Sequence, residues 1–181
     1  RRTKWAVLPT LWMPEENVKK RAEQDKVPYI GWVKNGFIKT TPGNVVDYGF
    51  IREEIKRARN RYDIKEIGFD PWNASQVALD LTDDGLTMVE VRQGFKTMSP
   101  AMKELQKLLV GKELEHGGNP VLRWMFGNMA VKKDENENSR PVKDKSTERI
   151  DGIVALVNAL ARAVLQEDTS SPYDERGVRA L

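Results

Sequence analysis

Segments with β-strand character alternate with helical segments along most of this chain, and no other feature constrains its fold as strongly. The expected strands are short and apolar, and they lie at 4–12, 37–40, 64–69, 87–91, 112–114 and 129–131. The expected helices begin near proline, acidic or capping residues. Five of them lie at 14–25, 28–34, 74–81, 119–124 and 148–166, and two more begin after Asp47 and at Ser99. Residues 132–145 are charged and rich in turn formers, so we expect a hairpin or a mobile loop there. The alternation predicts an α/β domain built in three layers.

The length fits one domain with a short extension. At a prior of about 150 residues per domain, 181 residues predict a single domain. A domain of this size buries roughly 70% of the surface of its unfolded chain, so it needs neither a disulfide nor a metal to fold. Residues 167–181 are polar and contain Ser, Pro and Gly. We therefore assign 1–166 to the domain and 167–181 to a polar tail or linker.

The composition excludes several kinds of chemistry. Cysteine is absent, which rules out disulfides, thiol catalysis and cysteine-based zinc sites. A single histidine, His116, rules out metal sites with several imidazole ligands. Any metal must therefore be held mostly by oxygen, which suits magnesium, manganese or calcium. The sequence has no apolar run of about 18 residues that would span a membrane, no signal-peptide pattern, and no G-x-x-x-x-G-K-[ST] phosphate loop.

Charge is distributed unevenly along the chain. Residues 1–60 carry 13 basic and 7 acidic side chains, a net charge of +6, while the remainder carries a net charge of −3. A basic first third can follow a phosphate backbone. The alternative is a set of solvated helix faces that bind nothing.

Asp70 is the first candidate for a functional carboxylate. It follows the apolar strand segment 67–69 directly, and Pro71 ends that strand. Ligands of open α/β sheets bind at the carboxyl ends of strands. The alternative is a helix-capping aspartate, which is common before a helix.

Asp151 is the second candidate. If Ser146 caps the last helix, Asp151 is its fifth residue, beyond the first turn where the helix dipole favours acids. Ala155, Asn158 and Arg162 continue its stripe along the border of the apolar face. A carboxylate at such a border needs a partner or a metal. The alternative is a simple ion pair with a lysine or arginine.

Two carboxylates from distant segments could hold a divalent cation. Two-metal sites activate water and stabilise a leaving oxygen in phosphodiester hydrolysis, but they need three or four acidic ligands. A third ligand must therefore come from elsewhere. His116, before two glycines, and Lys143 and Lys145, before the Asp151 helix, are weaker candidates for binding phosphate or orienting water. The alternative for all three is an ordinary loop position.

An ordered series of short segments resembles a known family. The segments are 41–48 (TPGNVVDY), 70–74 (DPWNA), 93–95 (QGF) with 98–100 (MSP), 116–121 (HGGNPV) and 145–152 (KSTERIDG). In this order they resemble the C-terminal nuclease domain of the large terminase subunit of tailed bacteriophages. The resemblance covers nearly all of residues 4–165.

The resemblance implies an RNase H-like fold, a mixed sheet flanked by helices. It implies an endonuclease that binds two metal ions, either Mg²⁺ or Mn²⁺. Such an enzyme cuts concatemeric double-stranded DNA when packaging starts and when the head is full. Asp70 and Asp151 match the family's metal ligands on a central strand and on the last helix. The implied partners are DNA, a terminase ATPase domain, the small terminase subunit and the portal, in the cytoplasm of an infected bacterium and without a membrane.

The sequence departs from the family pattern at one place. The family has an earlier aspartate on the first strand of the sheet, whereas no acidic residue precedes Glu15 here. We therefore expect the first strand and its aspartate to lie upstream of Arg1, which leaves both the sheet and the metal site incomplete. A binding or motor-docking module without catalysis is the alternative function, and another RNase H-like enzyme, such as a resolvase, is a third.

Overall fold

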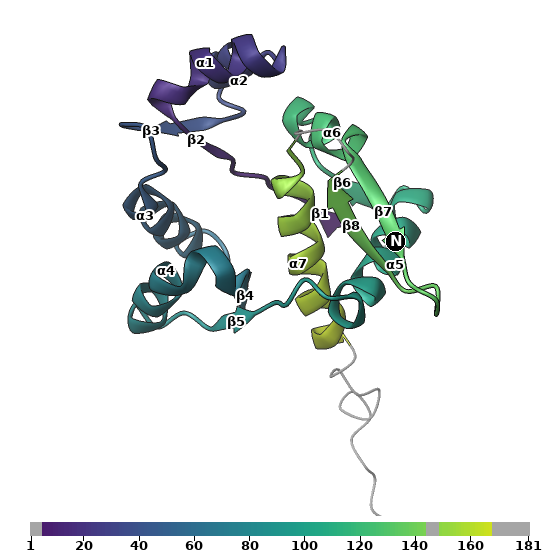
Figure 1. The fold of residues 1–181 in the computed structure, drawn as a ribbon. Helices are drawn as coiled ribbons and strands as arrows, with labels where there is room; N and C mark the ends of the chain where they lie inside the picture. Colours follow the sequence, from purple (N-terminus) through teal and green to yellow (C-terminus); the bar gives the residue numbers. More distant parts are fainter. Residues whose placement is uncertain (1–4, 144–148, 168–181) are drawn as a thin grey trace, which may run out of the picture.

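The computed structural model describes residues 5–143 and 149–167 (Figure 1). The helices are α1 (Glu15–Asp25), α2 (Tyr29–Lys34), α3 (Tyr48–Arg59), α4 (Pro71–Asp83), α5 (Phe95–Val110), α6 (Pro120–Gly127) and α7 (Asp151–Glu167). The strands are β1 (Trp5–Ala6), β2 (Trp12–Pro14), β3 (Lys39–Thr41), β4 (Ile67–Phe69), β5 (Met88–Glu90), β6 (Leu114–Glu115), β7 (Met129–Lys133) and β8 (Ser139–Lys143). The predicted α/β class is confirmed.

The strands form pairs rather than the one mixed sheet expected from the sequence. Among the described residues the pairs are β1 with β6, β2 with β3 and β4 with β5, all parallel, and β7 with β8, which is antiparallel. The last pair confirms the hairpin alternative for the segment 132–145. The expected strand at 4–12 is divided in two, because Pro9 has no backbone N–H to donate to a ladder.

Three helix boundaries differ from the sequence-based expectation. The helix expected at 74–81 begins at Pro71 as α4, since Pro71 occupies the first helical position, where its missing N–H costs nothing. Helix α5 begins at Phe95, not at Ser99, and it contains Pro100; the earlier start buries Met98 at 1% exposure. Helix α7 begins at Asp151 rather than at residue 148, and the expected cap, Ser146, lies outside the described residues.

The main core lies where α7 packs against α5 and α6. Its largest fully buried side chains include Met98, Leu105 and Leu108 of α5, and Ile153 and Val157 of α7. Complete burial of a side chain of this size contributes about 1.5–3 kcal/mol. This core is extended by apolar residues of α1, α2 and the segment that contains β1.

A ring cluster closes one end of this core. Tyr29, Trp32 and Trp124 meet with ring centroids 5.5–5.9 Å apart in edge-on or tilted arrangements. Burial, followed by the charge of Asp25 and the hydrogen bond to it, raises the pKa of the Tyr29 hydroxyl to about 12.

Helices α3 and α4 and strands β4 and β5 form a second packing unit. Its buried apolar residues, Ala78, Leu81, Leu86 and Val91, are separate from the main core. Figure 1 shows α7 between this unit and the group formed by α5, α6 and β6–β8.

Among the described residues, no helix is long and apolar enough to cross a membrane.

A forked ion pair fastens α3 to the end of α4. Arg52 donates from Nε to Asp84 Oδ2 at 2.6 Å and from Nη2 to Oδ1 at 2.7 Å. Arg59 Nη1 donates to the Asp84 carbonyl at 2.7 Å. The hydrogen bond from Arg52 is the main reason that the pKa of Asp84 is lowered from 3.8 to about 2.

We predict an acid-dependent loss of stability that originates at Asp84. Because its pKa is lower in the folded chain, its stabilising contribution is complete above pH 3.8 and is lost as the pH falls through about 2. Urea unfolding measured along this pH range should show a flatter decline for Asp84→Asn than for the parent chain. The neighbouring exposed Asp83→Asn should follow the parent curve, and equal slopes for all three would contradict the assignment.

Candidate active site

Asp70 lies where β4 ends and α4 begins. Its Oδ1 accepts a hydrogen bond from the Trp72 backbone N–H at 3.2 Å, which caps α4. Its Oδ2 accepts a hydrogen bond from Gln93 Nε2 at 2.9 Å. Both oxygens therefore accept hydrogen bonds, one from the backbone and one from a side chain. The capping role that the sequence left as an alternative is present, and it does not exclude a ligand role.

Asp151 is the first residue of α7, so the position inferred from the sequence is wrong. The expected fifth position rested on a helix beginning near Ser146. Instead, the Ile150 carbonyl accepts from the N–H groups of Ile153 and Val154 at 2.9 and 3.0 Å, which places the helix start at Ile150–Asp151. Ile150 is buried at 3% exposure and anchors this end, while Asp151 is exposed. The helix dipole therefore favours the Asp151 carboxylate.

The fold brings Asp70 and Asp151 to one hollow of about 580 Å³. Gly68 and Phe69 of β4 form one wall, and residues 140–142 of β8 form another. Ala155 and Asn158 line it from α7, so three members of the stripe predicted from Asp151 face the same space. Arg162, the fourth, lies further along α7 and pairs with Glu66 instead.

Three further polar side chains of this hollow were given no role on sequence grounds. Gln93 comes after β5, the parallel neighbour of β4, so the carboxyl edge shared by the two strands could have predicted its approach to Asp70. Arg140 of β8 lies over the Phe95 ring, 5.2 Å from its centroid. Asn158 is 5% exposed, and its Oδ1 has no hydrogen-bond partner among the described residues.

The hairpin that carries Arg140 is held to the main core. The Ser139 N–H donates to the Ser99 hydroxyl at 3.2 Å, and β8 packs along α5. Ser99 is 2% exposed, so this attachment is internal. No sequence signal pointed to Arg140, because its place in the hollow depends on how the hairpin folds back.

The weaker candidates are not gathered at this hollow. His116 lies between β6 and the turn before α6, and it is absent from the lining residues. Lys143 is the last residue of β8, beyond the lining residue Val142, so the backbone leads from the hollow to it. Lys145 lies outside the described residues. A phosphate role for these three residues remains a prediction.

The donor set fits a hard divalent cation. The Asp70 and Asp151 carboxylates and the unpartnered Asn158 Oδ1 are oxygen donors, which Mg²⁺ and Mn²⁺ prefer. Within the described residues no three acidic or histidine side chains cluster closely enough to hold a metal. The described residues therefore bring two carboxylates to the hollow, whereas a two-ion site requires three or four.

Strand β4, which leads into Asp70, packs closely on α7, which begins with Asp151. A Cβ at Gly68 would lie 3.0 Å from Val91 Cγ2, 3.3 Å from Arg162 Cγ and 3.5 Å from the Asn158 carbonyl oxygen. Beside this contact, Arg162 donates from Nε and Nη2 to the Glu66 carboxylate at 2.7 and 3.2 Å. Hydrogen bonding to Glu66 is the main reason that the pKa of the Arg162 guanidinium is raised above its usual value.

Comparison with known proteins gives consistent matches. A sequence model of the family described as "Terminase large subunit, endonuclease domain" matches residues 5–167. The chain is 37% identical over 161 residues to the large terminase subunit of Enterobacteria phage HK97, which covers 88% of this chain and 32% of that protein. It is 34% identical over 186 residues to protein YmfN of Escherichia coli K12, which covers 98% of this chain and 41% of that protein. The chain thus spans 32–41% of the length of these relatives.

Solved structures agree with the sequence matches. The crystal structure of the HK97 large terminase superposes with a TM-score of 0.80 at 37% identity, covering 88% of this chain and 34% of that one. The large terminase nuclease of thermophilic phage G20c has a TM-score of 0.53 at 12% identity, covering 66% of this chain and 64% of that one, which shows a shared fold. These matches confirm the resemblance and the RNase H-like fold expected from the sequence.

We predict that Gly68→Ala separates β4 from α7. The new methyl group would meet packed neighbours at 3.0–3.3 Å, so the free energy of unfolding should fall by about 1–3 kcal/mol. Gly31→Ala in α2 is the matched control, because a Cβ there meets nothing within 4 Å. It should be neutral or stabilise by up to about 1 kcal/mol. Urea unfolding measures both, and equal stability of the two variants would contradict the close approach.

Proposed function

The chain belongs to the family of terminase large-subunit endonuclease domains, and from this premise we propose that it is a metal-dependent endonuclease that hydrolyses phosphodiester bonds of double-stranded DNA. The observation that carries the proposal is the convergence of Asp70 and Asp151, from separate packing units, on one polar hollow. The biological substrate we propose is concatemeric viral DNA, cut at the start and at the completion of packaging.

The residues of the hollow have distinct roles in this proposal. Asp70 and Asp151 would hold Mg²⁺ or Mn²⁺, which when bound would polarise a phosphate and activate water. Gln93 fixes the orientation of the Asp70 carboxylate through its 2.9 Å hydrogen bond. The guanidinium of Arg140 is the basic group among the described lining residues, and it can hold a phosphate oxygen by charge-assisted hydrogen bonds.

Phosphate recognition makes the proposed cleavage largely independent of base sequence, because backbone contacts carry no sequence information. His116, Lys143 and Lys145 are proposed as additional groups for phosphate or water. The proposed partners are the terminase ATPase domain, the small terminase subunit and the portal, and the proposed place of action is the cytoplasm of an infected bacterium.

A second candidate function is a DNA-binding or motor-docking module without catalysis. It is favoured by one observation, that the described residues supply two carboxylates and no cluster of three. The two candidates differ in a direct test with a chain extended upstream. Binding to DNA that weakens with salt, without any metal-dependent cleavage, would favour the second candidate.

We predict that Asp70→Asn and Asp151→Asn each reduce plasmid nicking in Mn²⁺ by more than about 100-fold, beyond the loss typical of a residue that only supports a ligand. Asparagine is chosen because its side-chain oxygen can still cap α4 at position 70, so the charge is removed while the cap is kept. Nicking by the parent chain should cease in a chelator.

Asp83→Asn is the matched control, since Asp83 is an exposed aspartate at the far end of α4. It should nick DNA at the parent rate. Full activity in both Asp70→Asn and Asp151→Asn would overturn the site assignment.

We predict that Gln93→Ala raises the Mn²⁺ concentration needed for half-maximal nicking by about 10–100-fold, because Asp70 loses the donor that orients it. Mn²⁺ binding followed by electron paramagnetic resonance should weaken in parallel, without DNA. Gln76→Ala removes a similar hydrogen bond, 3.0 Å to Asp80 on α4, outside the hollow. An equal effect of the two variants would show that Gln93 has no special role.

A further inference from the structure

Trp72 is the most exposed large apolar residue among the described residues, at 89%. Its indole makes no contact with another ring or with a cation in the described part of the chain. Aromatic side chains bury about 150–250 Å² each when they are covered, so an indole in water leaves a large apolar area unused. This ring belongs to the second residue after Asp70, at the edge of the candidate site.

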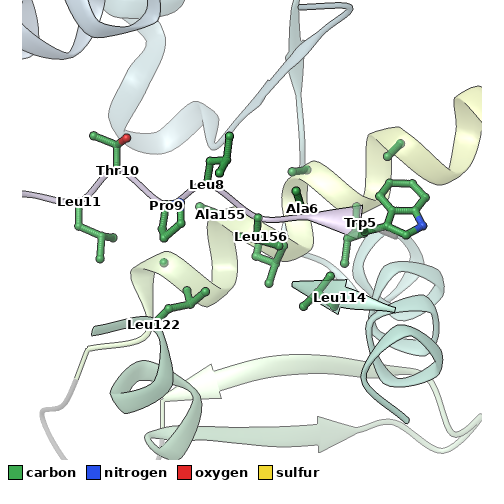
Figure 2. A pocket seen from close by; sticks show the side chains of 15 residues that line it. Trp5, Ala6, Leu8, Pro9, Thr10, Leu11, Leu114, Leu122, Ala155 and Leu156 are labelled. Atoms are coloured by element: carbon green, nitrogen blue, oxygen red, sulfur yellow. The ribbon is translucent and has the colours of Figure 1, made fainter. Parts of the chain in front are cut away.

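The exposure of Trp72 differs in kind from that of a side chain in an apolar cavity wall. Leu8, which is 67% exposed, lines a slot of about 430 Å³ between the segment from Trp5 to Leu11 and α7. Figure 2 shows Leu8 there among other apolar side chains. Trp72 lines neither this slot nor the hollow of the two aspartates. The Trp72 ring therefore projects into solvent beside the candidate site instead of forming a cavity wall.

The backbone that carries the ring is held in place by local contacts. Pro71 occupies the first position of α4, and its own ring fixes its φ angle. The Trp72 N–H donates to Asp70 Oδ1 at 3.2 Å, and the Ser75 hydroxyl donates to the Pro71 carbonyl at 2.8 Å. A side chain on a backbone that is already ordered loses little further entropy when it binds a ligand, which suits a contact residue.

The ring belongs to the same sheet edge as the candidate ligands. Side chains of a helix tilt toward its N-terminus, which in α4 is the end that carries Asp70. The loop after β5 lies beside this end, because Gln93 donates to Asp70 at 2.9 Å. In that loop Arg92 is exposed, and the cation Arg140 lines the hollow next to it. Cations and an exposed indole are thus found around one pair of carboxylates.

A flat π surface beside a site for phosphate matches a nucleobase. The Asp70 Oδ1 atom is 3.2 Å from the Trp72 backbone nitrogen. Successive nucleotides of one DNA strand are about 3.4 Å apart along the helix axis. A phosphate held near Asp70 and a base held by Trp72 can therefore belong to the same nucleotide or to neighbours. Bases of every kind stack on aromatic side chains, since each has a π face.

The surroundings of Trp72 on α4 fit a single base better than a protein surface. Protein docking sites are contiguous apolar patches. On a helix the neighbours of Trp72 are the residues three and four positions on, which are the exposed polar residues Ser75 and Gln76. The next exposed apolar residue of this face, Leu79 at 61%, lies beyond them. One ring framed by polar groups offers the area of one base.

Stacking on Trp72 restricts the kind of DNA that can bind. In a paired duplex the faces of each base are covered by the neighbouring base pairs, so a base must leave the stack before it meets a protein ring. This step costs least where the base is already unpaired. Locally unpaired DNA is therefore the substrate class that gains most from an exposed indole at this position.

We propose that Trp72 stacks on an unpaired nucleobase next to the scissile phosphodiester bond, so that the domain binds and cuts locally unpaired DNA in preference to fully paired DNA. The inference rests on the proposed nuclease function, which places the phosphate near Asp70. It adds to that function a class of preferred substrate and the residue that selects it. Trp72 contacts the base in this proposal, and the cleavage itself remains with the groups of the hollow.

Binding of the 181-residue chain to two DNA duplexes tests the proposal without cleavage. The duplexes have the same sequence, and one contains a central bulge with the fluorescent base 2-aminopurine. Fluorescence anisotropy in a chelator should show that the chain binds the bulged duplex about 5–100-fold more tightly than the paired duplex, the range expected for stacking of one base. The 2-aminopurine fluorescence should fall on binding, because stacking on an indole quenches it.

Trp72→Ala should lose both the preference for the bulged duplex and the quenching. Its melting temperature should equal that of the parent chain, because the side chain that is removed is exposed. Trp72→Phe should retain part of both effects, since a phenyl ring still stacks on a base. Tyr62→Ala is the matched control, because Tyr62 is a 53% exposed aromatic residue that precedes the opposite end of β4, and it should behave as the parent chain.

The proposal would be overturned by equal affinity of the parent chain for the two duplexes, or by a preference that Trp72→Ala retains. A loss of affinity in Trp72→Ala that is equal for both duplexes, without quenching in the parent chain, would also overturn it. Plasmid nicking in Mn²⁺ separates the two hypotheses. Nicking without a preference for bulged DNA would remove the stacking role and leave the nuclease function in place. Quenching that requires Trp72, without nicking, would support the stacking role and favour the DNA-binding module.

Discussion

The close approach of β4 to α7 is the contact on which the candidate site depends. Asp70 belongs to the unit of α3, α4, β4 and β5, and Asp151 belongs to the helix of the main core, so neither core alone brings the two carboxylates together. Gly68 permits backbone contact with α7, and the forked Glu66–Arg162 pair fixes the register of strand and helix beside it. Gly68 also lines the hollow, and it lies two residues before Asp70. The glycine that permits the contact is therefore close in sequence to the carboxylate whose place depends on that contact.

Two carboxylates that share a hollow repel each other, and the fold reduces this cost without a cation. Asp70 is the N-cap of α4 and Asp151 is the first residue of α7, so each lies at the positive end of a helix dipole. The contribution of each dipole is about 0.3–1 kcal/mol at exposed positions. The hydrogen bond from Gln93 and the nearby guanidinium of Arg140 act in the same direction.

Local sequence signals predicted the parts of this fold that depend on local chemistry. The acidic start of α1 and the Asp47 cap of α3 follow directly from residue preferences. The predicted start of α7 was wrong because Ser146 offered a strong local cap, whereas the helix begins after the buried Ile150, whose carbonyl accepts from Ile153 and Val154. Arg140 and Asn158 could not be assigned a role from sequence, since their places in the hollow result from packing between segments far apart in the chain.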